Sequence, residues 1–182
     1  MNPTVYITGS AAFLPNAGVD NAHIESVLGQ IGPRPSRAKR IVLKNNGIQS
    51  RHYAIDPASR LPTHTNAQMT AEAVRGLFPQ GPVQTTALVC GTSTPDQTMP
   101  NHAVMVQGDL GAPIREVLAT SGICLSGVSA LKYAYLGVKT GEYTSAVATG
   151  SDLPSPLLRA EFFAPESEEQ LLNLRRNPEL AF

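Results

Sequence analysis

The chain has 182 residues, a length that suits one domain with a substantial core. Its formal net charge at pH 7 is zero, so no basic excess indicates binding to nucleic acid or to an anionic membrane surface. Charged residues make up only 15% of the chain, against roughly 25% in typical soluble domains. This shortage fits either burial against a partner or a compact α/β domain rich in small residues.

The cysteines and the apolar runs indicate in which cellular compartment the protein is expected. Two cysteines, Cys90 and Cys124, do not make a disulfide framework, and each lies in an apolar stretch. No apolar run reaches the roughly 18 to 20 residues of a membrane span, and residues 1–15 lack the basic start of a signal peptide. We therefore expect reduced thiols and a cytoplasmic protein.

The first half of the chain predicts a strand, a short helix, an irregular stretch and a longer helix. Residues 5–13 begin with β-branched and aromatic residues and predict a strand. A helix is expected from Asp20 or Asn21 to Ile31, and another over residues 66–78. Residues 33–62 between them are expected to be irregular. They hold a basic cluster that is either a solvated loop or a positive rim for a phosphate-bearing carrier, namely Arg34, Arg37, Lys39, Arg40 and Lys44.

The second half predicts strands that alternate with helices. Strands are expected over residues 86–90, 116–119 and 145–149. The helices between them are expected to start at about residues 101 and 124 and to end before Gly111 and Gly141. This alternation predicts an α/β fold with a largely parallel sheet that is buried on both faces.

The tail of the chain differs in composition. After an irregular stretch from residue 154, acidic residues precede basic ones over residues 166–176, an order that complements a helix dipole and predicts a short charged helix. Nothing near Phe182 closes a sheet.

Cys124 is the candidate nucleophile because it lies where a strand is expected to turn into a helix. The small residues around it, in Thr-Ser-Gly-Ile-Cys-Leu-Ser-Gly, permit a tight turn. A helix N-terminus lowers the pKa of a thiol and favours thiolate, and nearby amides could bind a thioester oxyanion. The residues alone leave open that Cys124 is an ordinary buried thiol.

The other reactive side chains have weaker patterns. Cys90 lies inside an expected strand and is interpreted as structural. His23, His52 and His64 show no metal-ligand spacing with one another or with a cysteine, and neither does His102, which we expect at the surface in the first turn of its helix. We therefore expect no metal and no nucleotide cofactor.

Four segments resemble, in order and rough spacing, the ketosynthase III group of thiolase-fold condensing enzymes. They cover about residues 4–152. The first is Asn-Gly-Ile-Gln-Ser-Arg-His at residues 46–52, and the second runs from Gly-Thr-Ser-Thr-Pro-Asp at 91–96 to Gln-Gly-Asp-Leu-Gly at 107–111. The third is the turn around Cys124 at 121–127, and the fourth runs from Gly-Glu-Tyr at 141–143 to Gly-Ser-Asp at 150–152.

The resemblance implies an acyltransferase that carries an acyl group on Cys124. A malonyl-type or β-ketoacyl thioester then attacks it in a Claisen condensation, as in fatty-acid, polyketide or dialkylresorcinol- and pyrone-type biosynthesis. Met99 falls where the family extends a residue into the acyl pocket of its dimer partner, so a homodimer is expected. Residues 1–152 would form the amino-terminal half of the fold, and residues 153–182 would lead to a second half.

The sequence also departs from the family. The family's catalytic His and Asn come from the second half, and nothing in residues 1–182 matches them. A Trp that coenzyme A users place near Arg40 is absent, and an Arg near Asn45 is replaced, which favours an acyl carrier protein over coenzyme A as the thioester partner. The alternatives are a non-catalytic half that serves as a scaffold and a single-domain binding protein that folds alone.

Overall fold

The computed structural model describes residues 4–32, 34, 39–163, 167, 169, 172–173 and 176. The chain forms two compact units. The first joins Pro15 and the residues before it to Thr63–Leu153, and the second joins Asn16–Pro62 to the residues from Pro154 onward.

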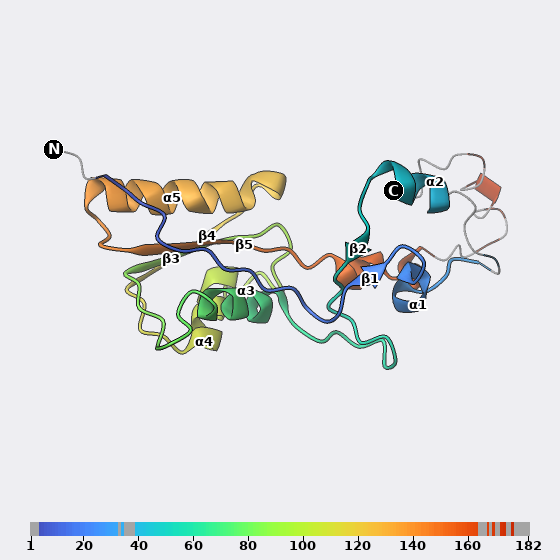
Figure 1. Cartoon of the computed structure of the whole chain (residues 1–182), viewed down its shortest axis with the longest axis horizontal. Coiled ribbons are helices and arrows are strands. Elements are labelled where there is room, and N and C mark those ends of the chain that lie inside the picture. Colours follow the sequence, from blue (N-terminus) through green and yellow to red (C-terminus); the bar gives the residue numbers. More distant parts are fainter. Residues whose placement is uncertain are drawn as a thin grey trace. The chain divides into compact units, whose positions relative to one another are not determined.

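A three-stranded parallel sheet forms the centre of the first unit (Figure 1). The strand order is β4 (Glu116–Thr120), β3 (Ala87–Gly91), β5 (Ala146–Gly150). In the register of the sheet, Gly91 lies opposite Thr120 on one side and Gly150 on the other, so all three carboxyl ends meet at one edge. All five residues of β3 are buried, as expected of a strand covered on both faces. The predicted α/β fold with a parallel sheet is confirmed.

Helices cover both faces of this sheet (Figure 1). α3 (Asn66–Arg75) and α4 (His102–Leu110) pack on one face, and α5 (Ser126–Thr140) packs on the other. The core on the α3–α4 side includes Leu88 and Val106, and the core under α5 is built on Val89, Ala130 and Ala134.

Local capping chemistry fixes the ends of these helices. Thr65 and Gln68 form a reciprocal capping box at the start of α3, and the Asn101 side chain accepts the Val104 amide in the first turn of α4. Gly111 and Gly141 end α4 and α5 in the left-handed conformation. The predicted helix over residues 66–78 ends three residues early, because residues after Arg75 tighten into turns.

The second unit is small and holds short elements. β1 (Val19–Asp20) pairs antiparallel with β2 (Ser50–Arg51), beside α1 (Ile24–Leu28), α2 (Lys39–Asn45) and the 3₁₀ turns η2 (Ser155–Leu158) and η3 (Ala160–Phe162). Its core is built on Val27, Tyr53 and Ile55. The predicted helix from Asp20 or Asn21 to Ile31 is shorter, because Gly29 adopts a φ of +90° and ends it.

Two predictions for the first half of the chain are wrong. Residues 33–62 were expected to be irregular, yet they contain α2, whose Lys, Arg and Leu residues favour helix. Residues 5–13 were expected to be a strand, yet Tyr6 and Ile7 are 76% and 82% exposed and no described strand pairs with the segment. β-Branched residues favour a strand only where neighbours complete a half-buried sheet surface.

The predicted charged helix over residues 166–176 lies largely outside the described residues, as do Arg37 and the side chain of Arg40 in the basic cluster. Within the described part of the chain, no helix combines the length and the apolar character that crossing a membrane requires.

Candidate active site

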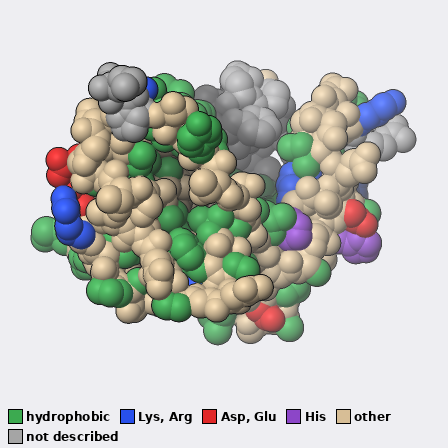
Figure 2. All heavy atoms as spheres, turned by 60° about the vertical axis from the view of Figure 1, so that its left-hand side comes forward, with side chains coloured by type: hydrophobic (Ala, Val, Ile, Leu, Met, Phe, Trp, Pro, Cys, Tyr) green, Lys and Arg blue, Asp and Glu red, His purple; other side chains and the backbone are tan. Residues whose placement is uncertain are grey.

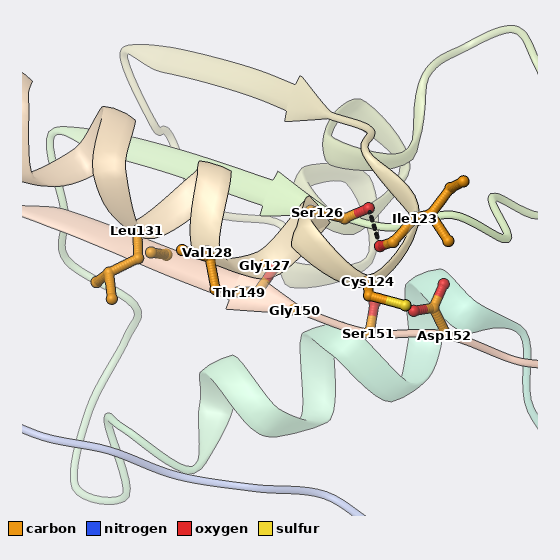
Figure 3. A pocket seen from close by; sticks show the side chains of 12 residues that line it. Ile123, Cys124, Ser126, Gly127, Val128, Leu131, Thr149, Gly150, Ser151 and Asp152 are labelled. Atoms are coloured by element: carbon orange, nitrogen blue, oxygen red, sulfur yellow. Dashed lines mark hydrogen bonds between the residues drawn. The ribbon is translucent and has the colours of Figure 1, made fainter.

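A pocket of about 510 Å³ lies at the edge of the sheet where β3 and β5 end (Figure 3). Gly91 lines it from β3, and residues 148–152 line it from β5 and the turn that follows. Its third wall is the turn before α5 together with the first turns of that helix, which supply Cys124, Val128 and Leu131. Carboxyl ends of parallel strands are where α/β proteins commonly bind ligands.

Cys124 lies in this pocket wall and is exposed. It is the middle residue of a 3₁₀ turn, η1 (Ile123–Leu125), that follows the end of β4 at Thr120. The sequence predicted that the helix begins at Cys124, whereas α5 begins at Ser126, so the thiol precedes the α-helix. Figure 3 shows the Cys124 side chain pointing toward Ser151 and Asp152.

The turn that carries Cys124 contains an unusual backbone conformation. Ile123 has a φ of +49°, which a β-branched residue rarely adopts. Such conformations cost about 1–3 kcal/mol and gather at functional sites, where the surrounding structure holds them. The Ile123 side chain is 76% exposed, so side-chain packing does not hold this turn.

Hydroxyl groups bind the backbone of the turn instead. Ser93 Oγ and Ser126 Oγ each lie 2.8 Å from the carbonyl oxygen of Ile123 and donate to it. Ser126 Oγ also accepts the Gly122 amide at 3.0 Å. The Thr120 hydroxyl donates to the Ser126 carbonyl at 3.0 Å, which joins β4 to the start of α5.

Three glycines let the start of α5 approach the sheet this closely. A Cβ placed on Gly91 would lie 2.2 Å from the Ser126 carbonyl oxygen, a separation that the backbone cannot accommodate. The Cα atoms of Gly127 and Gly150 would each lie 3.1 Å from a Cβ on the other residue. Small residues around Cys124 were therefore a correct signal for close packing.

Asp152 organises the loop after β3. One of its carboxylate oxygens accepts the amides of Ser93 and Thr94 at 2.8 and 3.1 Å, and the Thr94 hydroxyl at 3.1 Å. Asp152 lies two residues after the end of β5 and lines the pocket, so it ties this end of the strand to the loop that holds Ser93. Sequence reasoning noted Gly-Ser-Asp only as part of a family segment and missed this role.

His102 belongs to a buried polar group that contacts the pocket residue Ser151. The sequence placed it correctly in the first turn of its helix, but the expectation of a surface position was wrong, because only 2% of the residue is exposed. Its Nε2 lies 3.2 Å from both Thr70 Oγ1 and Ser151 Oγ, and Thr70 donates to Ser151 at 2.7 Å. Burial lowers the pKa of His102, and the charges of Asp96 and Asp152 oppose this shift.

The remaining sequence candidates lie elsewhere. Cys90 is buried in β3, where burial raises its pKa to about 11 and the Thr149 hydroxyl opposes the shift. Met99 is 84% exposed and precedes a cis proline. The structure places the other three histidines, His23, His52 and His64, outside the pocket lining. In the described ranges, no group of three or more His, Cys, Asp or Glu residues is arranged to hold a metal ion.

Comparison with known proteins shows which proteins this chain is similar to. No protein-family model matches the chain. The β-ketoacyl-[acyl-carrier-protein] synthase III of a Bradyrhizobium strain is 29% identical over 152 residues, which are 84% of this chain and 44% of that protein. The enzyme of the same name from Sphingopyxis alaskensis is 27% identical over 161 residues, or 87% and 46% of the two chains.

Solved structures give the same result. A tetronic acid condensing enzyme superposes with a TM-score of 0.63 at 28% identity and covers 81% of this chain and 45% of its own. The 3-oxoacyl-[acyl-carrier-protein] synthase III of Aquifex aeolicus superposes with a TM-score of 0.64 at 20% identity, over 81% of this chain and 44% of its own.

The fold is therefore the amino-terminal half of the fold of thiolase-type condensing enzymes. Within that class, the chain is related to the ketosynthase III group. It spans just under half the length of the relatives it matches.

Proposed function

We propose that this chain is the nucleophile-bearing half of a condensing acyltransferase, with Cys124 as the residue that accepts the acyl group. The observation that carries the proposal is an exposed thiol in the wall of a pocket, at the sheet edge where β3 and β5 end. The named relatives are a synthase III and a condensing enzyme, which supports this chemistry over a scaffold role.

The proposed reaction has two steps. The Cys124 sulfur attacks the carbonyl carbon of an acyl thioester, its proton passes to the departing thiol, and a new thioester forms at little cost in free energy. A malonyl-type thioester then loses carbon dioxide, and the resulting carbanion attacks the acyl carbon on Cys124. A β-ketoacyl thioester would instead lose a proton before it attacks. A carbon–carbon bond forms in either case, and the Cys124 thiolate leaves.

The second step requires groups that this chain does not supply. We propose that a second half, as long as the part of the relatives that this chain does not cover, contributes the His and Asn that assist decarboxylation. The exposed stripe of α5, defined as Val128, Leu131 and Tyr135, supports such a partner. These residues follow one another at helical spacing along α5, and they are 62%, 48% and 46% exposed. Val128 and Leu131 also line the pocket.

The substrate side of the proposal concerns the carrier and the dimer. A carrier protein is the favoured donor, with coenzyme A as the alternative, because the chain has no Trp with which to stack an adenine. The exposed Met99 is proposed to approach the acyl site of a second subunit.

The test is the intact mass of the protein after incubation with octanoyl-N-acetylcysteamine, a thioester that mimics the carrier arm. We expect one octanoyl adduct, located on Cys124 by peptide mapping and absent from Cys124→Ala. Cys90 should remain unmodified, because a buried thiol with a pKa of about 11 is protonated at neutral pH.

Absence of an adduct on Cys124 in a preparation that also contains the second half would contradict the proposal and favour the scaffold alternative. A stable, monomeric chain that unfolds cooperatively and takes no acyl group would instead favour a single-domain binding protein.

A further inference from the structure

The strained turn before α5 needs an external support, and the structure shows where that support comes from. Ile123 holds a φ of +49° with its side chain largely in solvent. Without a restraint, the residue would relax to a negative φ, which would rotate its carbonyl group and move the adjacent Cys124. Hydrogen bonds to the Ile123 carbonyl oppose this relaxation and, with it, movement of Cys124.

Three groups lie within hydrogen-bond reach of this carbonyl: the Ser126 amide, the Ser126 hydroxyl and the Ser93 hydroxyl. Each of the two hydroxyls has one hydrogen to donate. Both hydroxyl oxygens lie 2.8 Å from the Ile123 oxygen. They lie 3.0 Å from each other, within hydrogen-bond distance. Ser126 belongs to the turn itself, so Ser93 is the contribution from outside it.

Ser93 is itself held in place from a third segment. Its amide donates to Asp152 at 2.8 Å, and Asp152 also accepts the amide and the hydroxyl of Thr94. The loop after β3 is thereby fixed to the end of β5, and the Ser93 hydroxyl is directed at the turn. Asp152 thus holds Ser93, Ser93 contacts the Ile123 carbonyl, and Ile123 precedes Cys124 in the turn.

We propose that Ser93 is a positioning residue for Cys124, which acts through the Ile123 carbonyl rather than on the substrate. The proposal deepens the proposed function and rests on it for its catalytic meaning, whereas the support of the turn is independent of any reaction. Ser93 thus sets how fast bound thioester reacts and has little effect on how tightly it binds.

Two measurements on the 182-residue chain test this inference with Ser93→Ala. The maximal rate of Cys124 acylation by octanoyl-N-acetylcysteamine should fall roughly 10- to 100-fold, with the half-saturating concentration changed less than about twofold. Amide hydrogen exchange in residues 121–126 should rise roughly fivefold, because one hydrogen bond of the turn is lost. Ser93→Thr retains the hydroxyl and should restore both values.

Thr140→Ala is the matched control. It also removes a hydroxyl that donates to a backbone carbonyl, that of Leu136 at 3.0 Å, but at the far end of the same helix. It should leave the acylation rate and the exchange of residues 121–126 unchanged.

The inference is overturned if Ser93→Ala exchanges in residues 121–126 as the parent does, or if it acylates at the parental rate despite faster exchange. A Ser93→Thr variant as impaired as Ser93→Ala would also overturn it. If the parent takes no acyl group even when the second half is present, the proposed function fails, and the exchange data alone still decide whether Ser93 holds the turn.

Discussion

His102 is a titratable residue whose protonation the fold opposes. It is buried, and its Nε2 contacts the hydroxyls of Thr70 and Ser151, the latter in the pocket lining. A neutral ring that carries its proton on Nε2 can donate to these oxygens. A charged ring would add a donor on Nδ1, and no described atom accepts a hydrogen bond from Nδ1. Burial therefore favours the neutral form of this histidine and lowers its pKa.

A pH dependence of stability follows from the lowered pKa of His102. The unfolded chain binds a proton on this residue below its ordinary pKa of 6.5, whereas the folded chain does so only at lower pH. The contribution of neutral His102 is therefore complete above pH 6.5 and is lost as the pH falls toward the folded pKa, with a limiting slope of about 1.4 kcal/mol per pH unit. Urea unfolding of the parent and of His102→Gln at pH 7.5 and 5.5 measures this contribution to the free energy of unfolding.

The difference between the stability losses of these two proteins reports on His102 alone, because the carboxylates titrate in both and their effect cancels. His102→Gln keeps an amide donor for the hydroxyls, so we expect it to lose less stability than the parent on going to pH 5.5. Equal losses in the two proteins would show that His102 titrates alike in the folded and unfolded chains.

At the scale of elements, the contact between α5 and β3 depends on Gly91. Alanine at this position would place a methyl group against the Ser126 carbonyl, and neither backbone can give way. We expect Gly91→Ala to destabilise the first unit by about 3 kcal/mol, the upper end of the usual overpacking cost. The urea midpoint reports the loss, and the acylation rate of Cys124 should fall with it.

Gly108→Ala provides the comparison for this variant. Gly108 lies within α4, and a Cβ there would meet nothing within 4 Å. Alanine is the better helix former, so this change should stabilise the protein by about 0.5–1 kcal/mol. A loss of stability of similar size in both variants would refute the close-contact argument.

Elements with local signals were predictable from the sequence. α3 and α4 begin where Thr65 and Asn101 cap them, and α4 and α5 end at glycines, because capping is chemistry between neighbouring residues. The strands of the parallel sheet were predictable because short apolar runs rich in β-branched residues alternate with longer helical stretches. The strand expected over residues 5–13 failed because a strand also needs a partner, which the segment's own composition cannot report.

The site was predictable only in part, for the same reason. Small residues on both sides of Cys124 indicated its turn correctly. The positive φ of Ile123 had no local signal, since isoleucine disfavours that conformation. Ser93 and Asp152 come from distant segments and reach the turn only through the parallel register of β3 and β5.

At the scale of the whole molecule, apolar side chains at the surface predict association. Figure 2 shows apolar side chains spread over one face of the protein, with few charged ones among them. The exposed stripe of α5 adds three apolar side chains that face solvent, and exposed apolar patches mark interaction sites. We expect the 182-residue chain to bind the dye ANS and to self-associate.

Substitution of the stripe tests this expectation. The double variant Val128→Lys, Leu131→Lys should lower ANS fluorescence at least twofold and shift sedimentation toward monomer. Its own stability should change by only about 0.5 kcal/mol per site, because both residues already face solvent. Val104→Lys, at a 42% exposed position on α4, is the control and should leave both readouts unchanged. Equal ANS binding by all three proteins would exclude the stripe as the interaction surface.

The order β4–β3–β5 has a consequence for how the chain is made. The central strand, whose residues are all buried in the finished fold, leaves the ribosome first of the three. Its second neighbour, β5, begins at Ala146, roughly 60 residues later. At the usual 5–20 residues per second, one edge of β3 waits about 3 to 12 s for its partner. During that interval the nascent chain exposes an apolar strand edge to its surroundings, so faithful folding depends on slow, long-range pairing that a chaperone could protect.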